Sequence, residues 1–260
     1  MGQRVSEETI TDINMLELQS KHRKTLVVRK YSKQTEEPIE GADWEMWFAS
    51  RGIVLGFRIQ AKILLGNDYP GIPYIIRSTR RRQIDLLIER AFASTPRRIP
   101  FYVLYNYWAT LPFSRSELCG TYPPDDEMLG CGLAYAPHVK QMVDVRKSTS
   151  LIDMQQITYP WSCLVCCTAN SNAALPLRSF EFAKELVVRR FQDMFPSDVL
   201  SAENFVTNHP PEYLVRVLEG GTLTDDEWRE SNLKMVVVAR EGNHEGRVCP
   251  APMNDATRAT

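Results

Sequence analysis

Long apolar runs are missing from this chain of 260 residues. No stretch approaches the roughly 18 uncharged apolar residues that a membrane helix needs, and residues 1–30 lack the apolar segment of a secretory signal. These absences predict an intracellular, cytoplasmic protein without a membrane partner. Hydrophobic residues still make up 43% of the sequence, which is enough to bury the core of one large domain or of a domain with an appendage.

Cysteine is also scarce, with six irregularly spaced residues. This number is too small for a disulfide framework, so we expect free thiols in a reducing compartment. Cys163, Cys166 and Cys167 contain one C-x-x-C pair, but the second half of a zinc site is missing from the sequence. We therefore place them in a buried strand, "WSCLVCC". A small-molecule hydrolase that uses this cysteine-rich strand stays a third alternative for the function.

A strong net charge is absent too, because the total is -1. Residues 1–110 nevertheless hold 17 Lys and Arg against 12 Asp and Glu, whereas the remainder holds 14 against 20. A basic first part favours a polyanionic partner there. The candidate nucleic-acid-binding residues are Lys30 and the run Arg80-Arg81-Arg82, with Arg97 and Arg98 beyond the next helix; such residues are equally typical of a solvated surface.

The order of elements in residues 1–110 is helix, three strands, helix, strand. The helix over 6–20 begins after Ser6, and Ile10, Ile13 and Leu16 are expected to start its buried stripe. The later elements are predicted at 25–32, 44–63 (two strands joined near Ser50-Arg51-Gly52), 79–94 and 101–108.

Beyond residue 110 the signals are weaker. They predict the strand "WSCLVCC", a helix over 178–195, a short helix over 213–218 and a strand from Leu233. The chain is therefore expected to be an α/β (α+β) protein. We divide it into a core at 1–110, an α/β extension at 111–240 that either packs on the core or shares its compact domain, and a tail at 241–260.

The two strands over 44–63 show the clearest pattern. Apolar and polar residues alternate from Leu55, so that Gly56, Arg58, Gln60 and Lys62 share one face of the second strand. A turn centred between Arg51 and Gly52 places Asp43 opposite Gln60, with Lys62 as a diagonal neighbour. The simplest interpretation of this face is a solvated surface.

Together these polar groups suit one kind of chemistry. The carboxylate of Asp43, the amide oxygen of Gln60 and the main-chain carbonyl of Ala61 are hard oxygen ligands for Mg²⁺ or Mn²⁺. The ammonium of Lys62 can orient an attacking water and stabilise charge that develops on a phosphate. The hypothesis is metal-dependent hydrolysis of phosphodiester bonds.

The same residues resemble those of the PD-(D/E)XK, or restriction-endonuclease-like, nuclease superfamily, whose core has the order αβββαβ. Gly41-Ala42-Asp43 and Gln60-Ala61-Lys62 are similar to the Mrr-type variant, in which Gln replaces the second acid. The strings "GADWE" and "QAK" are also similar to those of an uncharacterised microbial family. The resemblance covers residues 6–108.

This resemblance implies a DNA endonuclease that serves in defence against foreign DNA, with a homodimer as one candidate assembly. Asp43, Gln60 and Lys62 would be catalytic, and Asp43, Gln60 and Ala61 would hold the metal. Glu8 is the first choice for an auxiliary acid from the first helix, and Glu7 is the second. A neutral Gln60 weakens metal binding unless such an acid supplies the missing charge. The alternative is a catalytically inactive nucleic-acid-binding or scaffolding protein with a nuclease-like fold.

Overall fold

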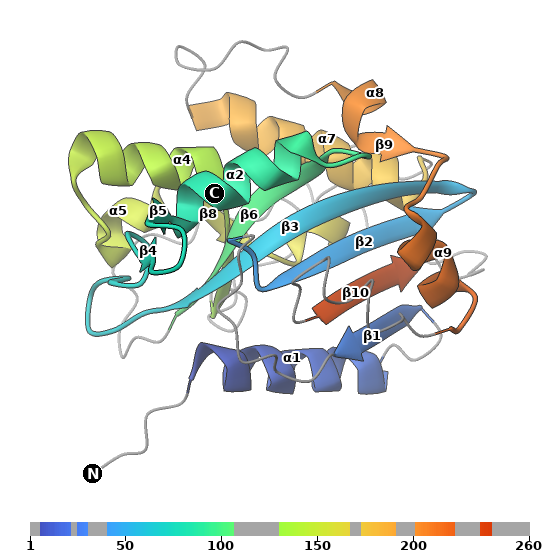
Figure 1. Cartoon of the computed structure of the whole chain (residues 1–260), viewed down its shortest axis with the longest axis horizontal. Helices are drawn as coiled ribbons and strands as arrows, with labels where there is room; N and C mark the ends of the chain where they lie inside the picture. Colours follow the sequence, from blue (N-terminus) through green and yellow to red (C-terminus); the bar gives the residue numbers. More distant parts are fainter. Residues whose placement is uncertain are drawn as a thin grey trace, which may run out of the picture.

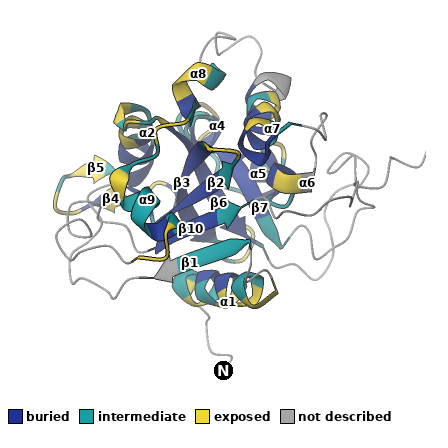
Figure 2. Ribbon diagram, turned by 90° about the vertical axis from the view of Figure 1, so that its right-hand side faces the viewer, coloured by how far each residue is buried: buried dark blue, intermediate teal, exposed yellow. Residues whose placement is uncertain are grey.

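A mixed β-sheet lies between layers of helices in the computed structural model of the chain (Figures 1 and 2). The structure describes residues 6–21, 25–30, 41–106, 130–166, 173–190, 201–221 and 235–240. The mixed α/β class expected from the sequence is confirmed. Within the described part of the chain, no helix is both long enough and apolar enough to cross a bilayer.

The first region follows the predicted order, with a small ribbon added. Its elements are α1 (Glu7–Lys21), β1 (Leu26–Lys30), β2 (Trp44–Ser50), β3 (Ile53–Ile63), β4 (Ile75–Ile76), β5 (Arg81–Arg82), α2 (Gln83–Ala93) and β6 (Arg98–Tyr105). Helix α2 begins later than predicted because Arg81 and Arg82 pair with Ile76 and Ile75 in the β4–β5 ribbon. Trp108, at the end of the predicted strand 101–108, lies outside the described residues.

The second region, beyond residue 110, contributes further helices and the strands β7 to β10. Its elements are β7 (Cys131–Tyr135), α4 (Ala136–Gln141), a π-helical turn (Met142–Arg146), α5 (Leu151–Gln155), β8 (Thr158–Pro160), α6 (Cys163–Cys166), α7 (Leu175–Arg190), α8 (Ala202–Phe205), β9 (Val206–Thr207), α9 (Glu212–Leu218) and β10 (Met235–Arg240). The helices predicted near 178 and 213 are present as α7 and α9, and β10 is the strand predicted from Leu233. Residues 191–195 lie outside the described ranges.

The strand predicted at "WSCLVCC" is wrong. Residues Cys163–Cys166 form the helical turn α6, in which the N–H of Leu164 bonds to the carbonyl of Trp161 at 3.1 Å and the N–H of Val165 to that of Ser162 at 3.0 Å. A short apolar run fits either a buried strand or a buried helical turn, so its composition alone does not decide between them.

The sheet has the order β1-β10-β2-β3-β6-β7-β8, and β9 also pairs with β3. Strand β10 lies between β1 and β2, antiparallel to the first and parallel to the second. Strands β7 and β8 extend the opposite edge beyond β6. Strands from the second region therefore complete the sheet of the first region on both sides of the β2–β3 hairpin.

The hairpin has the register that its turn predicts. Trp44 pairs with Ile59, and Ser50 pairs with Ile53. Arg51 and Gly52 form the turn with φ values of 51° and 77°. A two-residue turn with positive φ at both positions matches the right-handed twist of the strands, which explains why this connection sets the pairing.

The two faces of β3 pack against different helices. Leu55, Phe57 and Ile59 join a core with α1, α6 and α7, whereas the opposite face packs with α2, α4 and α9. The predicted alternation is thus confirmed, but the interpretation of the polar face as solvated is wrong. Gln60 is 1% exposed and Lys62 is 7% exposed, because helices cover both sides of the sheet (Figure 2).

Candidate functional site

Strand β3 continues beyond the end of its neighbour β2. The last pair between them is Trp44 with Ile59, while β6 still pairs with β3 as far as Ile63. On the β2 side, Ala61 and Ile63 therefore present main-chain groups that the sheet does not satisfy. Such groups need partners from elsewhere when they are shielded from water. Side chains supply these partners and form the candidate site.

Asp43 lies just before β2 and faces this open edge. Its main-chain N–H donates to the carbonyl of Ile59 at 2.8 Å, and its Oδ2 accepts a hydrogen bond from the N–H of Ala61 at 2.9 Å. The amide Nε2 of Gln60 donates both to Oδ2 of Asp43 and to the carbonyl oxygen of Ala61, the latter at 3.1 Å. The structure thus brings together Asp43, Gln60 and Ala61, with two oxygen atoms directed at one nitrogen.

Lys62 lies on the same face of β3 and meets an acid from α1. Its Nζ is 3.9 Å from Oε2 of Glu7, and Oε1 of Glu7 accepts a hydrogen bond from the N–H of Ile63 at 3.1 Å. The backbone of Gly71 packs over the Lys62 side chain so closely that a Cβ at Gly71 would lie 3.0 Å from Cδ of Lys62. The side chain of Glu7 is 33% exposed, so the site opens to solvent at the acid.

The acid beside Lys62 is Glu7, the second choice from the sequence, rather than Glu8. The buried residues of α1 are Thr11 and Met15, whereas Ile13 and Leu16 are 56% and 66% exposed. Of the predicted apolar stripe, Ile10 packs against the core, whereas Ile13 and Leu16 lie on the outer face of the helix. Glu7 precedes Thr11 by four residues, as Thr11 precedes Met15, so all three lie on the inner face of the helix. This four-residue spacing was the sequence signal that favoured Glu7 over Glu8.

Tyr102 is a further member of the site that the sequence assigns only to the core. It is buried and stands opposite Gln60 in the parallel β3–β6 pair. Its hydroxyl and Oε1 of Gln60 are both buried without a hydrogen-bond partner among the described residues. Burial raises the pKa of Tyr102 far above its usual value, and the nearby carboxylate of Asp43 adds to that effect. The hydroxyl is therefore protonated at any physiological pH.

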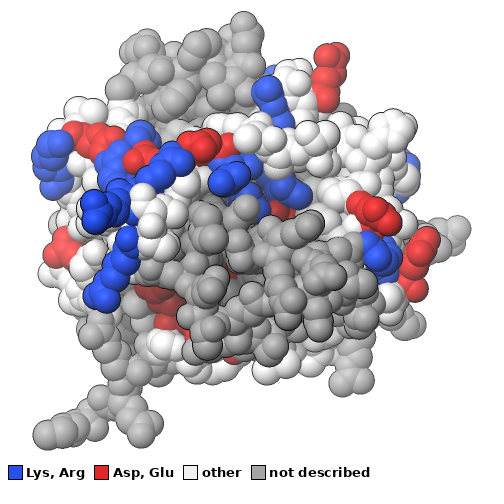
Figure 3. Space-filling model, in the orientation of Figure 1, with Lys and Arg blue, Asp and Glu red and all other residues white. Residues whose placement is uncertain are grey.

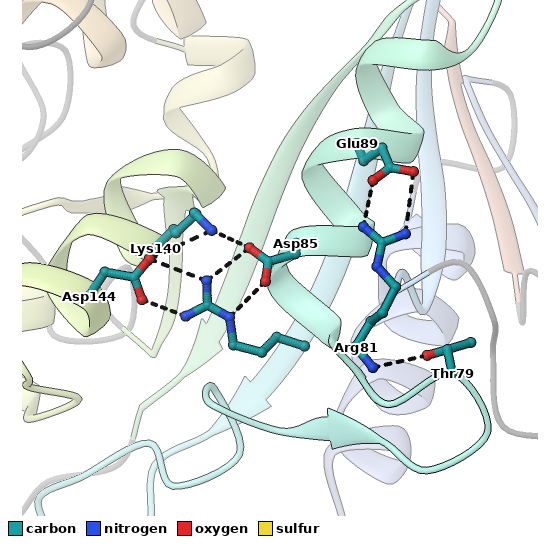
Figure 4. Close-up of polar contacts among 7 residues, drawn as sticks. Thr79, Arg81, Asp85, Glu89, Lys140 and Asp144 are labelled. Atoms are coloured by element: carbon teal, nitrogen blue, oxygen red, sulfur yellow. Dashed lines mark hydrogen bonds and ion pairs between the residues drawn. The ribbon is translucent and has the colours of Figure 1, made fainter.

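Two residues of the arginine run, Arg81 and Arg82, form ion pairs with acidic residues. Arg81 pairs with Glu89 at 2.5 Å, and Arg82 pairs with Asp85 at 2.7 Å and also with Asp144 (Figure 4). Lys140 bridges the same two aspartates, and its Nζ is 3.6 Å from Oδ2 of Asp144. Figure 3 shows this surface as basic residues mixed with acidic ones, not as a uniformly basic patch.

The other basic candidates differ in their surroundings. Arg80 is exposed in the tight turn of the ribbon, at φ 55°. Lys30 lies in β1 opposite Met235, and its side chain is outside the described part of the structure. Arg98 is buried, with Nε 3.0 Å from Oε1 of Glu45, so its expected role in phosphate contact is wrong. Arg80 is therefore exposed, whereas Arg98 is not.

The described residues give little support to the two alternative sites, a cysteine nucleophile and a metal site built from His, Cys, Asp or Glu side chains. Cys163 is a buried thiol outside any disulfide, while the side chains of Cys166 and Cys167 are outside the described part. Burial lowers the pKa of His138 to about 4, so this imidazole is neutral near pH 7. No group of three or more His, Cys, Asp or Glu side chains that could hold a metal occurs in the described ranges.

These features define a mixed α/β protein with a buried polar site at the open edge of its central hairpin. A model of a protein family matches residues 1–245, and the chain belongs to that family, which is described as a family of unknown function (DUF6615). No curated protein and no solved structure matches the chain. The function must therefore be argued from the site.

Proposed function

We propose that the protein is a Mg²⁺- or Mn²⁺-dependent endonuclease that hydrolyses phosphodiester bonds of DNA in the cytoplasm. The observation that carries the proposal is the convergence of Oδ2 of Asp43 and the carbonyl oxygen of Ala61 on a single position, the one that Nε2 of Gln60 takes. Lys62 projects from the same face of β3 two residues further on. A role in defence against foreign DNA rests on the resemblance to restriction-type nucleases alone.

The donor set fits a hard divalent cation. Carboxylate, amide and carbonyl oxygens are the ligands that Mg²⁺ uses, and Mg²⁺ keeps several waters, so few protein ligands suffice. Asp43, Gln60 and Ala61 would hold the ion. When bound, the ion would supply positive charge for the phosphate and a lower pKa for the attacking water. Glu7 adds a second carboxylate near the site, which offsets the charge missing from Gln60.

Lys62 performs the remaining task in this proposal. Its ammonium group carries three donors and no acceptor, so it can orient a water and stabilise negative charge on a phosphate oxygen. Glu7, 3.9 Å away, holds the flexible side chain in place. On the outside of the molecule, Arg80 would contact the DNA backbone without reading its bases.

A second candidate is a nucleic-acid-binding protein without turnover. It is favoured by the burial of Gln60 and by the close cover that Gly71 forms over Lys62. In that case Asp43 and Glu7 serve only to satisfy the N–H groups of Ala61 and Ile63 at the open edge of β3. The two candidates share the fold and differ in catalysis.

The test is nicking of supercoiled plasmid DNA with Mg²⁺ or Mn²⁺ by the wild type, Lys62→Met and a control, Lys184→Met, in helix α7 on the other face of the sheet. We expect Lys62→Met to lose at least about 100-fold in rate, since it removes a charge that acts in the transition state. Its DNA binding, followed by fluorescence anisotropy, should persist, and Lys184→Met should nick like the wild type.

Each alternative has its own result. Salt-sensitive DNA binding by all three proteins without any nicking would support the inactive binding protein and contradict the nuclease. A hydrolase that uses the cysteines would instead be active without metal and inactivated by thiol alkylation. Nicking by Lys62→Met at the wild-type rate would contradict the role of Lys62.

A further inference from the structure

We propose that Tyr105, acting through Thr11, is the positioning residue that aims Glu7 at Lys62. This inference rests on the proposed function, because Glu7 supplies the second carboxylate of that site. It starts from a closed ring of contacts that joins the last residues of β3 and β6 to the first turn of α1.

The ring begins in the sheet. Tyr105 is the last residue of β6 and pairs with Ile63, the last residue of β3. The carbonyl of Tyr105 also accepts a hydrogen bond from the N–H of Leu64 at 2.9 Å. The side chain of Tyr105 is buried in the core that α1 covers. The sheet therefore fixes the backbone from which this hydroxyl projects.

Two hydrogen bonds carry this position to the helix. Oη of Tyr105 lies 2.7 Å from Oγ1 of Thr11, and Oγ1 of Thr11 donates to the main-chain carbonyl of Glu7 at 2.9 Å. A threonine hydroxyl has a single proton, and here the carbonyl of Glu7 receives it, so Tyr105 must be the donor to Thr11. Burial raises the pKa of Tyr105 above its usual value, so the phenol keeps the proton that it donates.

The side chain of Glu7 closes the ring. Its Oε1 accepts a hydrogen bond from the N–H of Ile63 at 3.1 Å, and its Oε2 lies 3.9 Å from Nζ of Lys62. Glu7 is the first residue of α1, and helix ends fray readily. The hydroxyl of Thr11 ties this end of the helix to a side chain of the sheet, so the carboxylate of Glu7 stays within reach of both Ile63 and Lys62.

The first experiment compares two backbone amides on the same edge of β3. Glu7 binds the N–H of Ile63, whereas Asp43 binds the N–H of Ala61 at 2.9 Å. Their hydrogen exchange is measured by NMR on the full chain, without metal, DNA or an activity assay. A general loss of stability would raise the exchange rates of both amides, but a displaced Glu7 should raise only that of Ile63.

The variants remove the hydroxyl groups of the ring one at a time. Thr11→Val removes both hydrogen bonds of Thr11 and should raise the exchange rate of Ile63 about fivefold, the value of one ordinary hydrogen bond, without affecting Ala61. Tyr105→Phe should act in the same direction but less strongly, because Thr11 can still donate to the helix. Thr11→Ser keeps the hydroxyl and should exchange like the wild type.

Thr158→Val and Tyr135→Phe are the matched controls. Thr158 is also buried, and its hydroxyl donates to the carbonyl of Met154, four residues earlier, at 2.6 Å. Tyr135 carries a buried hydroxyl that has no hydrogen-bond partner among the described residues. Neither hydroxyl belongs to the ring, so both variants should leave the exchange rate of Ile63 unchanged.

The second experiment tests whether the position of Glu7 matters for the reaction. Thr11→Val should lower the kcat for nicking of supercoiled plasmid with Mn²⁺ about fivefold, the factor expected for the loss of one hydrogen bond. The KM for the plasmid should stay unchanged, because Thr11 is buried and does not contact DNA. Thr11→Ser should restore the wild-type kcat.

The outcomes separate this inference from the proposed function. If Ile63 exchanges at the wild-type rate in Thr11→Val, or if Ala61 responds equally, the positioning role is overturned while the nuclease proposal stands. If Ile63 responds alone but Thr11→Val has the wild-type kcat, the inference is overturned for the reaction. If neither the wild type nor any variant nicks DNA, the proposed function fails, and a selective response of Ile63 still supports the link from Tyr105 to Glu7.

Discussion

One face of β3 carries apolar side chains such as Phe57, while the other carries Arg58, Gln60 and Lys62, and helices cover both. Burial of apolar surface stabilises a fold in proportion to its area. Burial of charges and amides is unfavourable unless each group finds a partner. The two faces of one strand therefore contribute to stability in opposite ways. Stability alone does not explain why polar residues are buried on the second face.

Each polar group on that face has a partner from a neighbouring element. Lys62 meets Glu7 of α1, and Gln60 meets Asp43 at the start of β2. Arg58 lies opposite Glu45 across the hairpin, and its Nε is 3.5 Å from Oε1 of Glu45. Nε of Arg98 is 3.0 Å from the same oxygen. The site and the ionic cluster around Glu45 are thus neighbours on one face of β3, where Arg58 and Gln60 are two residues apart.

The largest effect on stability should come from the apolar face. Phe57→Ala removes a fully buried ring and should lower the free energy of unfolding by about 3–5 kcal/mol. Lys62→Met keeps the length of the side chain and removes a buried charge, and the acid that it leaves behind, Glu7, is 33% exposed and can be solvated, so stability should be unchanged or higher. Urea denaturation measures both. If Lys62→Met lowers the free energy of unfolding as much as Phe57→Ala does, the two faces do not differ in their contribution to stability.

The next effect concerns the ionic cluster on the polar face. Glu45 accepts hydrogen bonds from Nε1 of Trp47 at 3.1 Å and from the hydroxyl of Tyr213 at 2.5 Å, besides its two ion pairs. Glu45→Gln removes a negative charge that two buried guanidinium groups share and should lower the free energy of unfolding by about 3 kcal/mol.

The matched control for Glu45 is Glu89→Gln, which breaks the exposed pair with Arg81 and should change little. Equal losses in the two variants, measured by thermal and urea denaturation, would show that burial does not set the importance of these charges.

The smallest effect on stability belongs to the exposed arginine run. Arg81→Ala removes one side of an exposed ion pair and should not change the denaturation midpoint. If this surface contacts DNA, the variant should weaken binding to all sequences equally and reduce the slope of log affinity against log salt by about 1. A salt slope identical to that of the wild type would remove Arg81 from the DNA-contacting surface.

Much of the fold follows from local patterns. The register of the hairpin came from the turn at Arg51-Gly52, and the face of each residue in β3 came from strict alternation. Helix α9 and strand β10 were likewise predicted close to their observed positions. Signals of this kind depend on the geometry of a few consecutive residues, and they hold whatever the rest of the chain does.

Several features of the candidate site depend on distant residues instead. The inner face of α1, and with it the choice of Glu7 over Glu8, was decided by packing against the sheet. The pairing of Arg82 with Asp144 joins residues that are remote in the sequence. Strand β10 inserts between β1 and β2, an arrangement for which the order of elements in the first region contained no signal.

By itself, the sequence determined which residues of β2 and β3 stand opposite one another, because a two-residue turn and a period of two are local properties of the chain. Only the tertiary structure decided that the polar face of β3 is buried and that Glu7 and Tyr102 border Gln60 and Lys62. Burial and proximity depend on which elements pack together, and that depends on the whole chain at once.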